Sequence, residues 1–169
     1  CAREARPWPP CGTSVPALVP RRLAEPFELL RDRATAAARS TGAPPRVFVA
    51  ALGSTADHAS RSTWLANFLA AGGIEAIAGD GFASSADAGR AFAESGVAVA
   101  CIASSDQVYS ELAEATAGVL KQAGASKIYL AGRPAKQAEL RAAGVDGFFS
   151  AGQNALDALT ALHAQLGIT

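Results

Sequence analysis

The sequence predicts an α/β fold built on a doubly wound, five-stranded parallel sheet with strand order 2-1-3-4-5. From Arg46 onward, short apolar runs alternate with longer helical runs, and this alternation is typical of parallel sheets covered by helices. Most helical runs also end at a glycine shortly before the next strand, as a left-handed helix end requires. These glycines are Gly72, Gly96, Gly124 and Gly144.

Five runs have the composition and length of buried strands. They are Val47–Leu52, Glu75–Ala78, Val97–Ile102, Lys127–Ala131 and Gly147–Phe149. The helices between them carry apolar residues at helical spacing. The first has Trp64, Leu65, Phe68 and Leu69, the third has Leu112, Thr116, Val119, Leu120 and Ala123, and the last has Leu156, Leu159, His163 and Leu166. We therefore expect His163 to be a packed or interfacial imidazole and Cys101 to be a small buried hydrophobe.

Residues 1–45 are predicted to form a leader, and residues 46–169 the α/β domain. Six of the nine prolines lie at or before Pro26, and proline-rich chain favours extended backbone. Within the leader, Glu25–Ala34 is predicted to be a helix, because Pro26 suits a first helical turn. Its apolar residues share one face at helical spacing: Phe27, Leu30 and Ala34. A helix this short buries little surface alone, so we expect the leader to lie on another surface.

The composition excludes several classes of partner. The 15 basic and 15 acidic residues balance, whereas nucleic-acid-binding domains are usually basic, so no nucleic-acid partner is expected. The apolar runs are too short to cross a bilayer, so no membrane partner is expected. The three cysteines lack the paired spacing of zinc sites, and their scatter favours a reduced, cytoplasmic setting. Because the chain starts at Cys1 and has no methionine, we expect a processed product or part of a longer protein.

The predicted topology brings four loops to the edge at the carboxyl ends of the strands, where open α/β sheets bind ligands. These loops are Gly53–Ser60, Ser104–Val108, Gly132–Ala135 and Ser150–Asn154. Asp57, and the run Ser104-Ser105-Asp106, are suited to capping the helices that follow. A phosphate-receiver function is excluded because Ala50 and Ala51 stand where acidic metal ligands are needed. No nucleophile, base and orienting acid can be grouped, so no catalytic residue is predicted.

From Arg46 to its end, the chain resembles the cobalamin-binding domain of methylmalonyl-CoA mutase and related cobalamin-dependent isomerases. In that family an Asp-x-His-x-x-Gly motif follows the first strand, a serine the third, a Gly-Gly pair the fourth and a glycine the fifth. Ser104, Gly132 and Gly152 stand at matching places. The resemblance implies a flavodoxin-like, cobalamin-binding-domain-like fold, in which the family's histidine is the lower ligand to cobalt and its glycines flank the nucleotide tail.

The ligand motif itself is altered in this chain. Counted from Gly53, the family's Asp, His and Gly positions hold Thr55, Asp57 and Ser60. His58 comes one residue late, which on a helix turns a side chain by about 100°. We therefore expect His58 to point away from the rim centre or into solvent, without the acceptor that orients a metal-bound histidine. Arg133 replaces the second glycine of the pair, and Arg133 and larger side chains along Gly53–Ser60 are expected to close the space for the tail.

The small subunit of heterodimeric bacterial methylmalonyl-CoA mutases is similar, because it keeps this architecture without the ligand motif. Gly12–Ser14 and Arg21–Asp32 are similar to that subunit's exit from its barrel domain. The resemblance implies that adenosylcobalamin is bound by the large catalytic subunit and that none is bound here. The resemblance also implies that the cofactor site is vestigial and that there is no metal site. The vestigial residues are His58, Ser104, Gly132 and Gly152. The partners it implies are the large subunit and the barrel of the same subunit, with this chain a noncatalytic part of an isomerase that supports heterodimer assembly.

Two other functions stay open on the sequence. One is a working cobalamin-binding domain in which His58 ligates cobalt. The other is a flavodoxin-like phosphate or flavin binder, because Gly53–Asp57 places hydroxyls and backbone N–H groups at a helix start, where anions are favoured.

Overall fold

The structure is a computed structural model that describes residues 22–168. Its elements in chain order are α1 (Glu25–Thr41), β1 (Arg46–Ala51), α2 (Thr55–Ala71), β2 (Glu75–Ala78), α3 (Ser85–Ser95), β3 (Val99–Ala103), α4 (Asp106–Val108), the π-helix η1 (Tyr109–Ala113), α5 (Glu114–Gln122), β4 (Lys127–Ala131), α6 (Gln137–Ala142), β5 (Gly147–Phe149) and α7 (Ala155–Gln165). The strands β2, β4 and β5 have the predicted bounds, and β1 and β3 differ at their ends.

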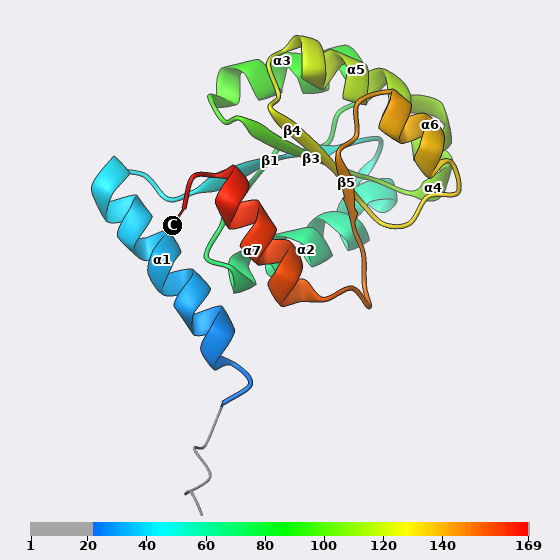
Figure 1. Cartoon of the computed structure of the whole chain (residues 1–169). Helices are drawn as coiled ribbons and strands as arrows, with labels where there is room; N and C mark the ends of the chain where they lie inside the picture. The colour runs from blue at the N-terminus through cyan, green and yellow to red at the C-terminus, as the bar shows by residue number, and fades with distance from the viewer. Residues whose placement is uncertain (1–21, 169) are drawn as a thin grey trace, which may run out of the picture.

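The five strands form one parallel sheet in the order β2-β1-β3-β4-β5, which confirms the predicted fold class. Helices α3, α5 and α6 cover one face, and α2 and α7 cover the other (Figure 1). This arrangement places the loops after β1, β3, β4 and β5 along one edge, as expected for a doubly wound sheet.

The sheet has a separate core on each face because side chains alternate along its strands. In β1, Phe48 and Ala50 pack toward α3 and α5, whereas Val47 and Val49 pack toward α2 and α7. Cys101 of β3 is fully buried in the second core, and its burial raises the pKa of the thiol, so it is the inert hydrophobe that was predicted.

Two strand and helix ends differ from prediction for identifiable reasons. The strand β3 starts at Val99 because its neighbour β4 begins at Lys127, which pairs with Val99, so Val97 has no partner in the ladder. After α2 the left-handed residue is Gly73, with φ +74°, and not Gly72, with φ −94°. Gly72 is needed for space instead: a Cβ there would lie 3.0 Å from a methyl carbon of Leu159.

The leader helix α1 is longer than predicted and runs to Thr41, where Gly42 ends it with φ +82°. Its residues Leu30 and Ala34 are buried, with Leu30 in the core beneath α2 and α7. A guanidinium nitrogen of Arg31 also donates to the Ala71 carbonyl at 3.3 Å. Helix α1 therefore packs on the α/β domain itself, beside α7 (Figure 1). The predictions for the proline-rich run, Cys1 and Gly12–Ser14 fall outside the described residues.

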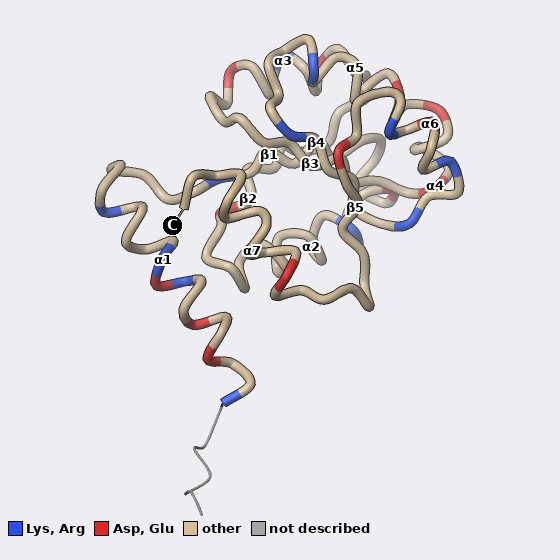
Figure 2. Tube along the Cα trace, viewed as in Figure 1, with Lys and Arg blue, Asp and Glu red and all other residues tan. Residues whose placement is uncertain are grey.

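Charged residues of both signs are interspersed along the chain, as Figure 2 shows most clearly for α1. Across residues 22–168, no helix has the length and apolar character needed to cross a membrane.

Candidate functional site

The first loop of the rim, after β1, is organised around a helix cap. Gly53 has φ +83°, and a carboxylate oxygen of Asp57 accepts hydrogen bonds from the Ser54 N–H at 2.9 Å and from the Ser54 hydroxyl at 2.6 Å. These bonds, the side-chain one first, lower the pKa of Asp57. The predicted capping role of the Asp57 carboxylate is confirmed, but Asp57 acts from position N3 of a capping box and Ser54 is the N-cap residue. Its negative charge at the start of α2 also occupies the place where a flavin phosphate would need to bind.

His58 is buried, so of its two expected orientations, away from the rim centre or into solvent, the second is wrong. Only 7% of the residue is exposed, because the loop after β2 lies over the imidazole. A Cβ at Gly81 of that loop would lie 2.9 Å from His58 Nε2. This nitrogen is buried and has no hydrogen-bonding partner among the described residues, and Nδ1 lies 3.5 Å from the Ser62 hydroxyl. The imidazole therefore faces the protein interior and not an open rim.

The end of β3 is held by a network of buried polar groups. Ser104 is fully buried, and its hydroxyl donates to the Leu52 carbonyl at 2.7 Å, which ties the ends of β1 and β3 together. The Tyr109 hydroxyl accepts from the Ser104 N–H at 2.9 Å and donates to the Ala131 carbonyl at 2.6 Å. Burial raises the pKa of Tyr109, so the phenol keeps the proton that it donates. Ser105, and not Ser104, caps α4.

Arg61 of α2 completes this network and is the main side chain that the sequence reasoning missed. Its guanidinium donates to the Ser104 carbonyl at 2.5 Å and to a carboxylate oxygen of Asp106 at 2.7 Å, and it lies 5.0 Å from the centre of the Tyr109 ring. A Cβ at Gly132 would be 3.3 Å from the Arg61 guanidinium carbon. Arg61 therefore fills the space directly above the first glycine after β4.

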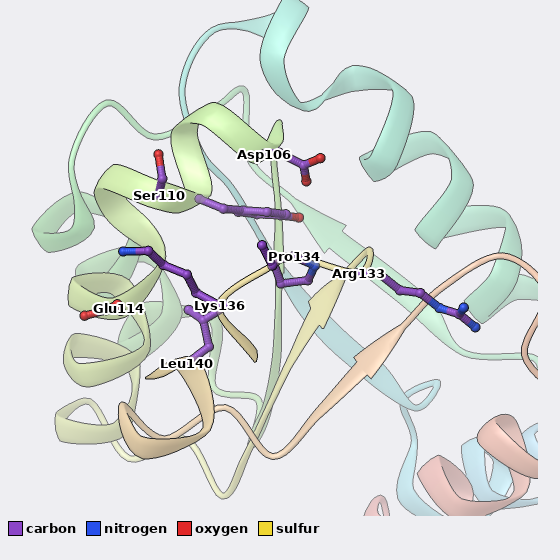
Figure 3. A pocket seen from close by; sticks show the side chains of 9 residues that line it. Asp106, Ser110, Glu114, Arg133, Pro134, Lys136 and Leu140 are labelled. Carbon is purple, nitrogen blue, oxygen red and sulfur yellow. The ribbon is translucent and has the colours of Figure 1, made fainter. Parts of the chain in front are cut away.

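Arg133, which follows Gly132 in the chain, is exposed and lies between two hollows of the rim. Its Nε donates to the Ser150 hydroxyl at 2.9 Å, so it bridges the loops after β4 and β5. One hollow, of about 350 Å³, lies between η1 and the loop before α6 and is bordered by Ser110, Glu114 and Lys136. Figure 3 shows that the Arg133 side chain points away from these three residues.

The second hollow, of about 360 Å³, lies between α2 and the loops after β4 and β5. It borders Arg61, Trp64 and Arg133, so neither arginine closes it completely. The expectation that Arg133 and larger side chains of the first loop close this space is therefore corrected: Arg61 fills the part next to Gly132, and an outer hollow stays open. Gly152 follows in the last loop with φ +83°.

In the described part of the chain, no three His, Cys, Asp or Glu residues are grouped as metal ligands. His163, the other histidine, is 2% exposed, and its Nε2–H donates to the Gly72 carbonyl at 2.8 Å, which confirms the prediction of a packed imidazole. Fold and rim together define a flavodoxin-like α/β domain whose ligand-binding edge is partly filled by its own side chains.

Comparison with known proteins identifies the relatives of this domain. No family model matches the chain. It is 41% identical over 160 residues to the methylmalonyl-CoA mutase small subunit of Streptomyces virginiae. The matched region covers 94% of this chain and 25% of that protein. The small subunit of Propionibacterium freudenreichii subsp. shermanii is 32% identical and covers 98% of this chain, and the probable small subunit of Mycobacterium bovis is 39% identical over 87%. The chain is a homologue of methylmalonyl-CoA mutase small subunits and spans about a quarter of their length. The resemblance stated from the sequence is confirmed.

Among solved structures, a LuxR-family DNA-binding response regulator from Staphylococcus aureus superposes with a TM-score of 0.50 and 11% identity, covering 72% of this chain and 98% of that one. At this level of identity the likeness concerns the fold alone.

The rim residues do not fit a cobalamin held as the family motif implies. A lower ligand must present an imidazole nitrogen to the metal and be oriented by an acceptor on its other nitrogen. Here His58 Nε2 is packed against Gly81. A nucleotide tail next to Gly132 would also overlap the Arg61 guanidinium, which is held there by Ser104 and Asp106.

Proposed function

We propose that this chain is the C-terminal part of a methylmalonyl-CoA mutase small subunit and that it supports assembly with the large subunit without binding cobalamin. In this proposal residues 46–169 form the cobalamin-binding-like domain and residues 1–45 form a linker with one helix. Adenosylcobalamin belongs to the large catalytic subunit. The enzyme complex works in the cytoplasm, and this chain contributes no catalytic residue.

The observation that carries the proposal is the position of Arg61. Its guanidinium spans from the Ser104 carbonyl of β3 to the neighbourhood of Gly132 after β4. Displacing it would leave a buried carbonyl without its donor, which costs about 1–3 kcal/mol. A cofactor tail would have to compensate that loss before it gained any affinity.

The burial of His58 supports the proposal independently. Exposing this imidazole to a corrin would require the loop around Gly81 to leave it, together with the backbone bonds that join the loop to β1: the Phe82 N–H donates to the Ala51 carbonyl at 2.7 Å, and the Gly53 N–H donates to the Phe82 carbonyl at 2.9 Å. A working cobalamin carrier is therefore disfavoured at both ends of the site.

The cofactor part of the proposal is tested by titrating the 169-residue chain with hydroxocobalamin while recording the visible spectrum. We expect no shift of the corrin bands. Restoring the motif with T55D, D57H and S60G should still give no shift, whereas adding R61A and R133G should allow binding. A band shift with the unmodified chain that disappears in His58→Ala would overturn the proposal.

The assembly part is tested with the complete small subunit co-expressed with its large subunit. The complete small subunit is compared with one that lacks residues 46–169, and the heterodimer fraction is measured by sedimentation. We expect the shortened subunit to form less heterodimer although its own unfolding transition is retained. Equal heterodimer formation by both would contradict an assembly role. Methylmalonyl-CoA turnover by the 169-residue chain alone would contradict its noncatalytic role.

A further inference from the structure

The open hollow between α2 and the loops after β4 and β5 has an unusual charge distribution. Two arginines, Arg61 and Arg133, and two serines, Ser60 and Ser150, border it, and within the described part of the chain no Asp or Glu does. Asp106 neutralises Arg61 from the other side. The excess positive charge of the hollow therefore lies on Arg133.

The Arg133 guanidinium is held in place but not saturated. Its Nε donates to the Ser150 hydroxyl, and within residues 22–168 neither of its terminal nitrogens has a hydrogen-bonding partner. A guanidinium with two free, parallel N–H groups matches the oxygens of a phosphate or carboxylate. Because Ser150 anchors the side chain, less conformational entropy is lost when an anion binds.

An aromatic side chain, Trp64, also borders this hollow. The Trp64 indole stacks on Phe68 with ring centres 5.3 Å apart and planes 11° from parallel. Trp64 also borders a neighbouring hollow of about 410 Å³, which is lined by Gly152 and Gln153 as well. An indole fixed by stacking offers a planar surface to another ring. Hollows of this volume are in the range that holds small ligands.

We propose that this hollow, bordered by Arg133, Trp64 and Ser150, binds a nucleoside monophosphate, with the phosphate at Arg133 and the base against Trp64. This binding goes beyond the proposed function and does not depend on it. The site requires only the outer hollow, and the Arg61 guanidinium that obstructs a cobalamin tail stays in place. The ligand combines the two chemistries that the hollow offers, a free guanidinium and an indole surface.

The test is isothermal titration of the 169-residue chain with AMP, adenosine and inorganic phosphate. We expect AMP to bind at least about tenfold more tightly than adenosine, because a hydrogen bond to a charged group is lost without the phosphate. We expect a similar difference between AMP and inorganic phosphate, because stacking of the base is lost. In a Trp8→Phe chain, where Trp64 is the remaining tryptophan, AMP should change the fluorescence.

Two variants and a matched control locate the site. Arg133→Ala and Trp64→Leu should each weaken AMP about tenfold. Arg141→Ala should leave binding unchanged, because Arg141 lies over Phe148 and does not border the hollow. Circular dichroism checks that each variant is folded, and if Trp64→Leu is unfolded the fluorescence change of Trp64 decides. No heat with AMP at millimolar concentration, equal binding of AMP and phosphate or of AMP and adenosine, or equal effects of Arg133→Ala and Arg141→Ala would overturn the proposal.

Discussion

Replacing Arg61 by alanine tests whether the rim network stabilises the fold as its geometry indicates. The variant loses the charged hydrogen bond to the Ser104 carbonyl, the ion pair with Asp106 and the contact with the Tyr109 ring. A hydrogen bond from a charged donor contributes about 1.5–3 kcal/mol. The Asp106 side chain is 70% exposed, so the ion pair adds about 0–1 kcal/mol. The cation–π contact adds about 0.5–1 kcal/mol.

These contributions share one guanidinium and are not additive, so we expect Arg61→Ala to lower the free energy of unfolding by about 2–3 kcal/mol. Urea unfolding followed by circular dichroism measures it. Asp106→Ala removes only the exposed pair and should cost less than about 1 kcal/mol. Arg141→Ala is the matched control, since this arginine also lies over an aromatic ring, Phe148, at 5.1 Å but on an exposed helix. If Arg61→Ala and Arg141→Ala agree within about 0.5 kcal/mol, the network is not stabilising.

Three further predictions follow from the packing. A Cβ at Gly89 would overlap a methyl group of Val119 where α3 contacts α5, so Gly89→Ala should destabilise the fold by about 1–3 kcal/mol. At Gly118 nothing lies within 4 Å of the added Cβ, so Gly118→Ala should stabilise the fold by about 0.5–1 kcal/mol. Urea unfolding measures both changes. The pKa of Asp146 is lowered although burial raises it, because its lysine partner and a backbone N–H donate to it. The carboxylate therefore stabilises the fold above its unfolded pKa, and this contribution is lost as pH falls through its folded pKa. Asp146→Asn should flatten the loss of stability on acidification, and an unchanged pH profile would contradict this. His58→Ala should cost more than about 1 kcal/mol because the ring is buried, whereas His58→Leu, which fills the space without an unpartnered nitrogen, should cost less; equal losses would show that packing of the ring is unimportant.

The fold was predictable because its signals are local and repeated. Strands such as Lys127–Ala131 are bounded by polar or glycine residues on both sides, and their near-continuous apolar runs are typical of a parallel sheet covered on both faces. The first residue of β3 was not predictable, because Val97 is apolar like the residues of the strand. Only the register with β4 excludes it from the strand. The π-helix η1 also lacks a local signal in the sequence.

The rim was predicted less completely because its chemistry depends on contacts between distant elements. Counting residues predicts that His58 is displaced from the family position, but it gives no information on the loop around Gly81 that covers the ring. Arg61 did have a sequence signal: it lies four residues before Leu65, on the helical face that carries the buried residues of α2. A charged residue on a buried face must find partners, since its desolvation is otherwise costly. In this fold the available partners are the backbone and side chains at the end of the neighbouring strand. An arginine in the apolar stripe of a helix near the ligand-binding edge of a sheet therefore predicts that the arginine side chain occupies part of that edge. This inference needs only the spacing of residues along the helix.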